Sequence, residues 1–244
     1  DMLHLTVAMI SPKRAFTEAT RASARIIERG GRRIGYMHVW ASIDSAAFRD
    51  ALVGLNPGLT FEQSGARGEW RQAGNARGRP RDSNGPADVL DALIIDARGK
   101  VGGLSSVPGE YLELIDPSPR RIRMTTAKSH GGERSRERVS FKGRSALLID
   151  RKTRSAAEIF AHAYKRDALG PVIGTTTAGA VTAGRGYIMP GDTYLYLAIT
   201  GLALDGERLE GKGVAPDISV ERPLPYAGGA DPVLEAAVKQ LVAN

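Results

Sequence analysis

The sequence predicts an α/β fold in which a mostly parallel central sheet carries helices on both faces. Three short apolar runs suggest this fold, at residues 92–96, 146–150 and 172–174. Continuous apolar runs of this length are typical of strands that are buried on both faces of a parallel sheet. Helical segments follow the first two runs, and strands that alternate with helices indicate a parallel sheet covered on both sides.

Composition is consistent with a globular domain. The chain has 244 residues, of which 42% are hydrophobic and 25% charged, so it is long enough to bury a sizeable core. No apolar run approaches the roughly 18 residues that a membrane span requires. Without cysteine, the chain can form no disulfide, thiolate metal site or cysteine nucleophile.

Several elements are expected before the first apolar run. Apolar spacing predicts a helix over Ala15–Arg29, ended by Gly30 and Gly31, and aromatic and branched residues predict a strand over Ile34–Trp40. A short helix is expected over Ser45–Leu52. Residues 62–87 have no periodicity and predict a long loop. The start at Asp1 has no signal peptide and reads as mid-domain, because residues 3–10 alternate like a strand with nothing before it, so we expect a fragment of a longer protein.

The later segments complete the predicted domain. They are expected to form a helix at Glu110–Ile115, an amphipathic helix after Ser155, a hairpin of Tyr194–Ile199 with Leu202–Leu204, and a last helix at Pro232–Val242. We therefore divide the chain into an N-terminal strand and helical arm at 1–33, a core domain at 34–225, and a C-terminal helical segment at 226–244 packed on the core.

The formal net charge of +7 raises the question of nucleic-acid binding. Many arginines lie in two glycine-rich stretches, residues 65–81 and 130–144. Neither stretch contains interleaved aromatic residues, and no nucleic-acid motif accompanies them. We interpret both stretches as solvated loops and expect no nucleic-acid partner.

Candidate functional residues follow the ends of the predicted strands. Gly102 and Gly103, then Ser155, then residues 177–180 form three turns that carry glycine or hydroxyl groups. In parallel sheets, ligands bind beyond the carboxyl ends of the strands. Three such turns at comparable strand ends therefore predict a site there.

Ser155 allows two interpretations. Ser155-Ala156-Ala157-Glu158 has the Ser-x-x-Glu pattern of a capping box, in which the serine only satisfies a helix amide. A hydroxyl between a buried strand and a helix is also where acyl-transfer enzymes place a nucleophile, because helix amides favour the developing negative charge there.

With these segments together, the chain resembles the C-terminal processing (tail-specific) peptidase family, which includes the tricorn core protease and retinoid-binding modules. The blocks that carry the resemblance are Ile34–His38, Leu93–Gly103, Ser155–Glu158, Ile173–Gly179 and Leu209–Asp217. The resemblance runs from about Ala15 to Val220. It implies a ClpP/crotonase-like peptidase core and a serine peptidase activity, with Ser155 as the nucleophile.

One departure from the family pattern concerns the general base. The processing branch has Thr-x-Gly-Lys, whose lysine activates the serine, whereas this chain has Thr177-Ala178-Gly179-Ala180. The tricorn branch, which also lacks the lysine, implies a histidine on the strand that contains His38. An imidazole with a pKa near 6.5 suits a base that takes and returns a proton. Otherwise His38 is a half-buried histidine beside Trp40.

The resemblance also supplies an orienting acid and an oxyanion hole. Glu210 lies where the tricorn branch has its catalytic glutamate. A turn residue beside Gly211 is the equal alternative. In the tricorn branch a serine links the histidine to the glutamate, and Met37 stands in its place here. The oxyanion hole would use the amides of Ala156 and Gly102. Asp96 and Arg98 are expected to brace the glycine turn.

The site pattern implies neither cofactor nor metal, and peptides or unfolded proteins are the expected substrates. Larger family members carry an upstream substrate-tail-binding PDZ domain, and the sequence leaves room for a homo-oligomer. The resemblance implies an extracytoplasmic bacterial setting. Two rivals remain: a non-catalytic binding module on the same fold, and an acyl-CoA enzyme of the crotonase type.

Overall fold

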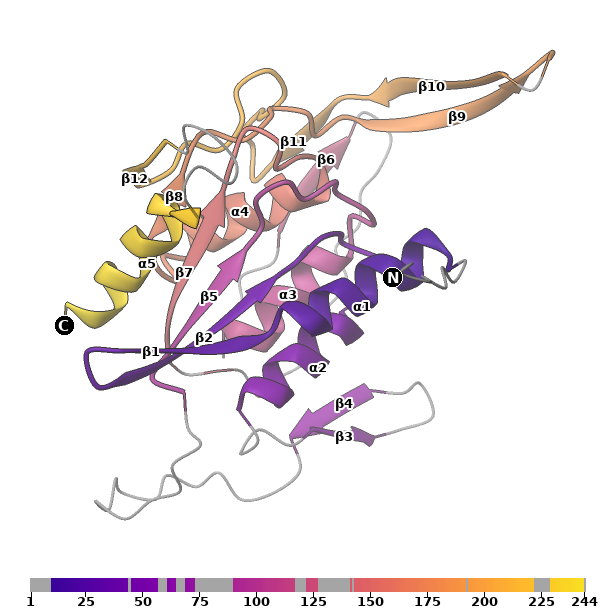
Figure 1. Ribbon diagram of the computed structural model, residues 1–244. Helices are drawn as coiled ribbons and strands as arrows, with labels where there is room; N and C mark the ends of the chain where they lie inside the picture. Colours follow the sequence, from indigo (N-terminus) through magenta and orange to yellow (C-terminus); the bar gives the residue numbers. More distant parts are fainter. Residues whose placement is uncertain are drawn as a thin grey trace, which may run out of the picture.

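A computed structural model gives the fold (Figure 1). It describes residues 10–43, 45–56, 61–64, 69–72, 90–116, 122–126, 141, 143–191, 193–221 and 229–243. The predicted strand at the N-terminus and most of the two arginine-rich stretches lie outside the described residues.

A six-stranded sheet forms the centre of the molecule. Its order is β1-β2-β5-β7-β8-β12, with every neighbouring pair parallel except β1 and β2. The strands are β1 (Arg25–Arg29), β2 (Arg32–His38), β5 (Ala92–Asp96), β7 (Arg144–Ile149), β8 (Val172–Gly174) and β12 (Ile218–Ser219). All five residues of β5 are buried, which explains why its sequence is continuously apolar.

Helices cover both faces of this sheet, and the predicted fold class is confirmed. The helices are α1 (Pro12–Ser23), α2 (Ala46–Leu55), α3 (Val107–Ile115), α4 (Ala156–Arg166) and α5 (Pro232–Val242). Apolar residues of α2, α3 and α4 form one core cluster with the sheet, and α5 forms a second cluster on the opposite face. No helix in the described ranges is both long and apolar enough to cross a bilayer.

The segment Arg25–Arg29 corrects the helix predicted over Ala15–Arg29. The helix ends at Ser23, and residues 25–29 form β1, antiparallel to β2. Gly30 and Gly31 both have positive φ, at 59° and 71°. Two consecutive positive φ values suit a tight hairpin turn whose twist matches the flanking strands. The two glycines therefore reverse a strand and do not end a helix.

The hairpin predicted from Tyr194–Ile199 and Leu202–Leu204 is also wrong in its pairing. The strand β10 (Thr193–Thr200) pairs with β9 (Ala183–Met189), and β11 (Leu202–Leu204) pairs with β6 (Met124–Thr126). A further hairpin, β3 (Phe61–Ser64) with β4 (Glu69–Gln72), lies within the predicted long loop. Figure 1 shows β9 and β10 projecting from the body of the molecule as an arm.

Candidate active site

Ser155 occupies a strained turn between β7 and α4. Its backbone has φ 55° and ψ −127°, an uncommon conformation for a residue with a Cβ atom. The chain reaches it from β7 through the loop 150–154, and α4 begins at the next residue. A sharp strand-to-helix turn of this kind exposes a nucleophile's hydroxyl at the edge of a sheet.

Gly102 packs directly against Ser155. A Cβ atom added at Gly102 would lie 2.7 Å from Ser155 Cβ and 3.2 Å from Ser155 Oγ. Gly102 also has a φ of 93°, which side chains rarely adopt. Neither its amide nor the amide of Ala156 donates a hydrogen bond within the described part of the chain. Two residues next to Ser155 therefore have amides that donate no hydrogen bond within the described part of the chain.

Glu158 fixes the turn at Ser155 to the loop at residues 177–180. Its buried carboxylate accepts the Ser155 amide at 3.1 Å, and the Thr177 hydroxyl and Gly179 amide at 2.6 Å each. The sequence predicted this glutamate as the closing residue of a capping box, and the structure forms that box. The Ala180 amide is a fourth donor to this carboxylate, at 2.8 Å. Glu158 therefore connects two of the three predicted turns.

Ala180 lies beside Ser155. Its carbonyl accepts the Ser155 amide at 3.0 Å, while its own amide is bound by Glu158. The position is therefore close enough for a longer side chain to reach the hydroxyl. A methyl group there leaves no proton acceptor.

His38 is held by a backbone carbonyl. Its Nε2 lies 2.8 Å from the Arg98 carbonyl oxygen, and its ring stacks on Trp40 with centroids 3.9 Å apart. Because a carbonyl only accepts, Nε2 carries the proton in the neutral ring, and the lone pair is on Nδ1. Among the described residues, the ring makes no hydrogen bond with Ser155 or Glu210.

The side chains of β2 alternate between the two faces of the sheet, and this places His38 on the face opposite to α4. Met37 and Val39 belong to the cluster of α2, α3 and α4, whereas Tyr36 belongs to the α5 cluster. Side chains two residues apart share a face of a strand, so His38 is on the α5 face with Tyr36. Ser155 begins the helix that packs on the opposite face, so the two side chains can meet only at the carboxyl edge of the sheet.

Glu210 is bound to the start of β9. Its carboxylate accepts the amides of Val181 at 2.9 Å and Thr182 at 2.8 Å. Hydrogen bonds from the Thr182 side chain and from these amides lower the pKa of Glu210, so its carboxylate is ionised at neutral pH. The loop that it binds continues from Ala180, which contacts Ser155.

Asp96 and Arg98 brace the edge of the sheet, in agreement with the sequence interpretation. Arg98 is buried and donates to the carboxylates of Asp96 at 2.6 Å and Asp231 at 2.8 Å. Asp231 also caps α5, through the amide of Leu234. The network connects the turn after β5 to the helix on the α5 face, which positions the Arg98 carbonyl that holds His38.

Comparison with known proteins identifies the family. The model of peptidase family S41 matches residues 81–220. The chain belongs to peptidase family S41. That stretch contains Gly102, Ser155, Ala180 and Glu210, whereas His38 lies before it.

Two curated relatives agree with this assignment to the S41 family. A tricorn protease homolog of Streptomyces coelicolor is 33% identical over 159 residues, which cover 61% of this chain and 13% of that protein. The carboxy-terminal processing protease CtpA of Bacillus subtilis is 32% identical over 156 residues, or 57% of this chain and 33% of that protein. The match thus spans a third or less of each relative.

Solved structures share the S41 fold. The photosystem II D1 C-terminal processing protease aligns with a TM-score of 0.55 and 18% identity, over 86% of this chain and 47% of that one. The tricorn protease aligns with a TM-score of 0.51 and 20% identity, over 94% of this chain and 18% of that one.

Lys100 is a feature of this S41 chain that sequence reasoning missed. The side chain is fully buried, its Nζ has no hydrogen bond among the described residues, and it lies 4.4 Å from the Tyr111 ring centroid. Burial lowers the pKa of Lys100 from 10.5 to about 7. Its backbone carbonyl accepts the amide of Arg154, the residue before Ser155.

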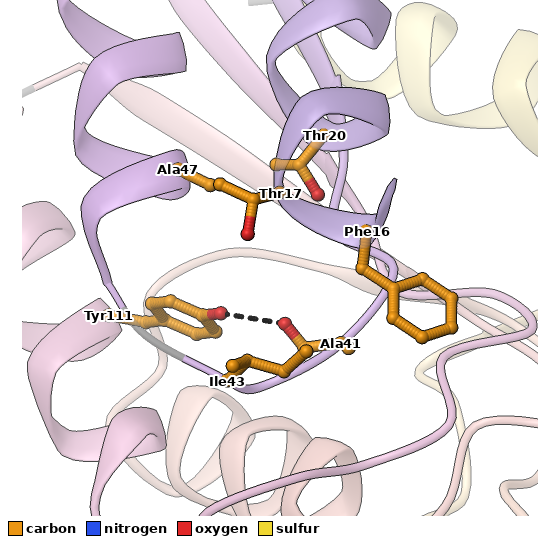
Figure 2. Close-up of a pocket in the computed structure, with 7 residues that line it drawn as sticks. All are labelled: Phe16, Thr17, Thr20, Ala41, Ile43, Ala47 and Tyr111. Carbon is orange, nitrogen blue, oxygen red and sulfur yellow. Dashed lines mark hydrogen bonds between the residues drawn. The ribbon is translucent and has the colours of Figure 1, made fainter. Parts of the chain in front are cut away.

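A small hollow, lined by none of the predicted site residues, lies between α1, α2 and the segment that follows β2 (Figure 2). Phe16, Thr17, Ala47 and Ile43 are among its lining residues, and the Tyr111 hydroxyl donates to the Ala41 carbonyl at 3.2 Å beneath it. It encloses about 220 Å³, open solvent included, which is below the usual size of a ligand pocket. Within the described ranges, no three His, Asp or Glu residues are grouped as a metal site requires.

Proposed function

We propose that this chain is the catalytic core of a serine endopeptidase of the tail-specific and tricorn type. Ser155 is the nucleophile, His38 the general base, and Glu210 the acid that stabilises the protonated base. The observation that carries the proposal is the strained Ser155 turn, flanked by the free amides of Gly102 and Ala156. Strain retained at one residue is typical of a functional site.

The proposed reaction is acyl transfer. Ser155 Oγ attacks the scissile carbonyl carbon while its proton passes to His38 Nδ1, and the Ala156 and Gly102 amides bind the resulting oxyanion. The C–N bond then breaks, and His38 returns the proton to the leaving amine. Water hydrolyses the acyl-serine by the same steps, which regenerates the Ser155 hydroxyl.

One contact of His38 and the contacts of Glu210 support the proposed roles. The Arg98 carbonyl fixes the proton on Nε2, which is the part that a triad carboxylate plays, and leaves Nδ1 as the acceptor. Glu210 is ionised and bound to the loop beside Ser155, so its charge favours a nearby imidazolium. For catalysis the His38 ring must turn about its hydrogen bond to the Arg98 carbonyl, without losing that bond, so that Nδ1 reaches Ser155 Oγ when substrate binds.

One observation favours a second function, a binding module without hydrolysis. His38 is hydrogen-bonded to Arg98 and Ala180 replaces the family lysine, so the hydroxyl of Ser155 has no base in hydrogen-bond contact in the described chain. Such a module would bind an extended peptide or apolar ligand at the same turn. The two functions differ in whether Ser155 is chemically activated.

Labelling with a fluorophosphonate tests this difference. We expect the wild-type chain to be labelled at Ser155, Ser155→Ala to remain unlabelled, and His38→Ala to be labelled at least about 100-fold more slowly, because general-base catalysis contributes about that much. Intact-protein mass spectrometry and peptide mapping measure the rate and the site. If His38→Ala is labelled at the wild-type rate, the proposed base is wrong.

Ala180→Lys distinguishes a missing base from a missing nucleophile. If the wild type is not labelled but Ala180→Lys is, the turn and amides are intact and only the base is absent, which supports the binding module. If neither is labelled, Ser155 is not a nucleophile. Circular dichroism of each variant checks that it is folded.

Gly102→Ala should slow the reaction of Ser155, because the new methyl group would collide with the Ser155 side chain. The new methyl group would lie 2.7 Å from Ser155 Cβ and would require a strained backbone, so we expect labelling to slow at least about 100-fold, the loss seen when an oxyanion donor is removed. Gly99→Ala is the matched control, because Gly99 also has a positive φ, of 67°, but nothing lies within 4 Å of its added Cβ. Equal labelling rates in the two variants would contradict the placement of Gly102 beside the nucleophile.

Substrate and setting rest on the family likeness. We propose peptides or unfolded proteins as substrates and an extracytoplasmic location, and an upstream PDZ domain would deliver a substrate tail to Ser155. Digestion of an unfolded test protein, with its folded form as the control, measures the substrate preference.

A further inference from the structure

The arm formed by β9 and β10 exposes an unusual amount of apolar surface. In the described part of the chain, the two strands pair only with each other, so both outer edges of the arm are free. Eight large apolar side chains of the arm are exposed: Tyr187, Ile188, Met189, Tyr194, Leu195, Tyr196, Leu197 and Ile199. A two-stranded hairpin is marginally stable in water by itself, and free apolar edges invite pairing.

One face of the arm is more exposed than the other. Register places Ile188 opposite Tyr194, and Tyr196 opposite Gly186, so Ile188, Tyr194 and Tyr196 share a face. These three are 86%, 66% and 61% exposed, whereas Tyr187, Met189, Leu195 and Leu197 on the opposite face are 39–46% exposed. We name the first group, with Gly184 and Gly186, the tyrosine face.

Glycines shape the tyrosine face into a flat aromatic surface. A Cβ atom at Gly184 would fall within 2.3 Å of the Tyr196 ring, so this ring lies over the glycine. The Tyr194 hydroxyl lies in the same way over Gly186, and Tyr196 Oη accepts the Gly184 amide at 3.2 Å. The rings therefore lie along the arm, with their outer faces open to an aromatic partner.

Charge distribution limits the kinds of partner that fit. Between Ala183 and Thr200 the sequence has two charged residues, Arg185 and Asp192. Arg185 pairs with Leu197 and lies on the face opposite to the tyrosine face. An uncharged surface has nothing to recognise an acidic peptide or anionic headgroups. It is compatible with a second copy, because two chains of net charge +7 can meet with little repulsion where the surface is uncharged.

We propose that the arm is a dimerisation element, in which the tyrosine faces of two copies pack against each other about a twofold axis. A twofold contact requires a surface that complements itself, and offset aromatic rings on a flat strand pair do so. The three side chains expose roughly 400 Å² per copy, about half of the area that a standard stable interface buries. The area is thus smaller than that of a standard stable interface, and we expect a reversible dimer.

Sedimentation velocity over a range of concentrations tests the proposal without reference to hydrolysis. We expect the wild-type chain to shift from monomer to dimer between about 1 and 200 µM. Ile188→Lys should raise the dissociation constant at least about 10-fold, because it buries a charge in the contact. Ile10→Lys is the matched control, since Ile10 is an exposed isoleucine outside the arm, and it should leave the equilibrium unchanged.

Crosslinking provides a second measurement that does not depend on sedimentation. The chain has no cysteine, so Ile188→Cys creates a single thiol, which a short bismaleimide should join to its copy in a dimer. Ile10→Cys should give no crosslinked dimer at the same concentration. A chain that stays monomeric throughout, a dimer that both lysine variants retain, or a monomer that binds neutral lipid vesicles through the arm would each overturn the proposal.

Discussion

Ser155→Gly should abolish peptide hydrolysis and at the same time stabilise the fold. Loss of the nucleophile is expected to lower kcat/KM by at least about 10⁴-fold. The same substitution removes the Cβ atom from a residue at φ 55° and ψ −127°, where strain is of the order of 1–3 kcal/mol. Glycine loses more chain entropy on folding, so the expected net gain in the free energy of unfolding is about 1 kcal/mol.

Ser155→Ala is the control that separates chemistry from strain. Alanine also lacks the hydroxyl, so the loss of hydrolysis should be equal, but it keeps a Cβ atom and therefore the strained conformation. Chemical denaturation of the two variants should place Ser155→Gly above Ser155→Ala in stability by about 1 kcal/mol or more. Equal stabilities would mean that the turn stores no strain, and hydrolysis by Ser155→Ala would mean that another residue is the nucleophile.

The centre of the fold could be predicted because its signals are local and agree with one another. The apolar runs in β5, β7 and β8 are too short for helices and too continuous for a half-exposed sheet, so burial on both faces was the consistent interpretation. The last helix was predicted over Pro232–Val242 and has these bounds, and an aspartate cap and a proline in its first turn mark its start.

The errors arose where a local pattern fits two structures. In Arg25–Arg29, the two isoleucines fit either the end of a helix or a short strand, and Gly30-Gly31 either ends a helix or turns a hairpin. The strand β9 was missed because Gly184 and Gly186 lower its apparent strand propensity. Its stabilising contacts come from tyrosines on the next strand, which no local window includes.

The site could be predicted in part. Gly102 and Ser155 lie in contact, as turns at neighbouring strand ends should. The sequence does not say on which face of the sheet His38 and Ser155 lie, because that depends on where α4 and α5 pack. The face on which each side chain lies decides how far the His38 ring must turn. The connecting role of Glu158 depends on four hydrogen bonds, three of them to residues about 20 positions away.

Lys100→Met should stabilise the protein by several kcal/mol below pH 7. Burial lowers the pKa of the native side chain to about 7, against 10.5 for an exposed lysine. Below pH 7 both the native and the unfolded states hold the proton, so the native state bears the full penalty of a buried ammonium, on the order of 4 kcal/mol. The contact with the Tyr111 ring offsets part of this penalty. Methionine keeps the length of the side chain and its apolar contacts without the charge.

The stability gap between Lys100→Met and wild type should close as pH rises. Between pH 7 and 10.5 only the unfolded wild-type chain binds the proton, so wild-type stability increases with pH by up to about 1.4 kcal/mol per pH unit. Denaturant unfolding of both proteins from pH 6 to 9.5 measures this slope, and Lys239→Met, at an exposed position on α5, should show no comparable change. A gap that is constant with pH would mean that Lys100 keeps its proton in the folded chain, because the Tyr111 and Phe160 rings or water hold the ammonium there. A gap that falls as predicted means that the chain holds a neutral amine two residues before Gly102, which contacts Ser155, at the pH where a peptidase works.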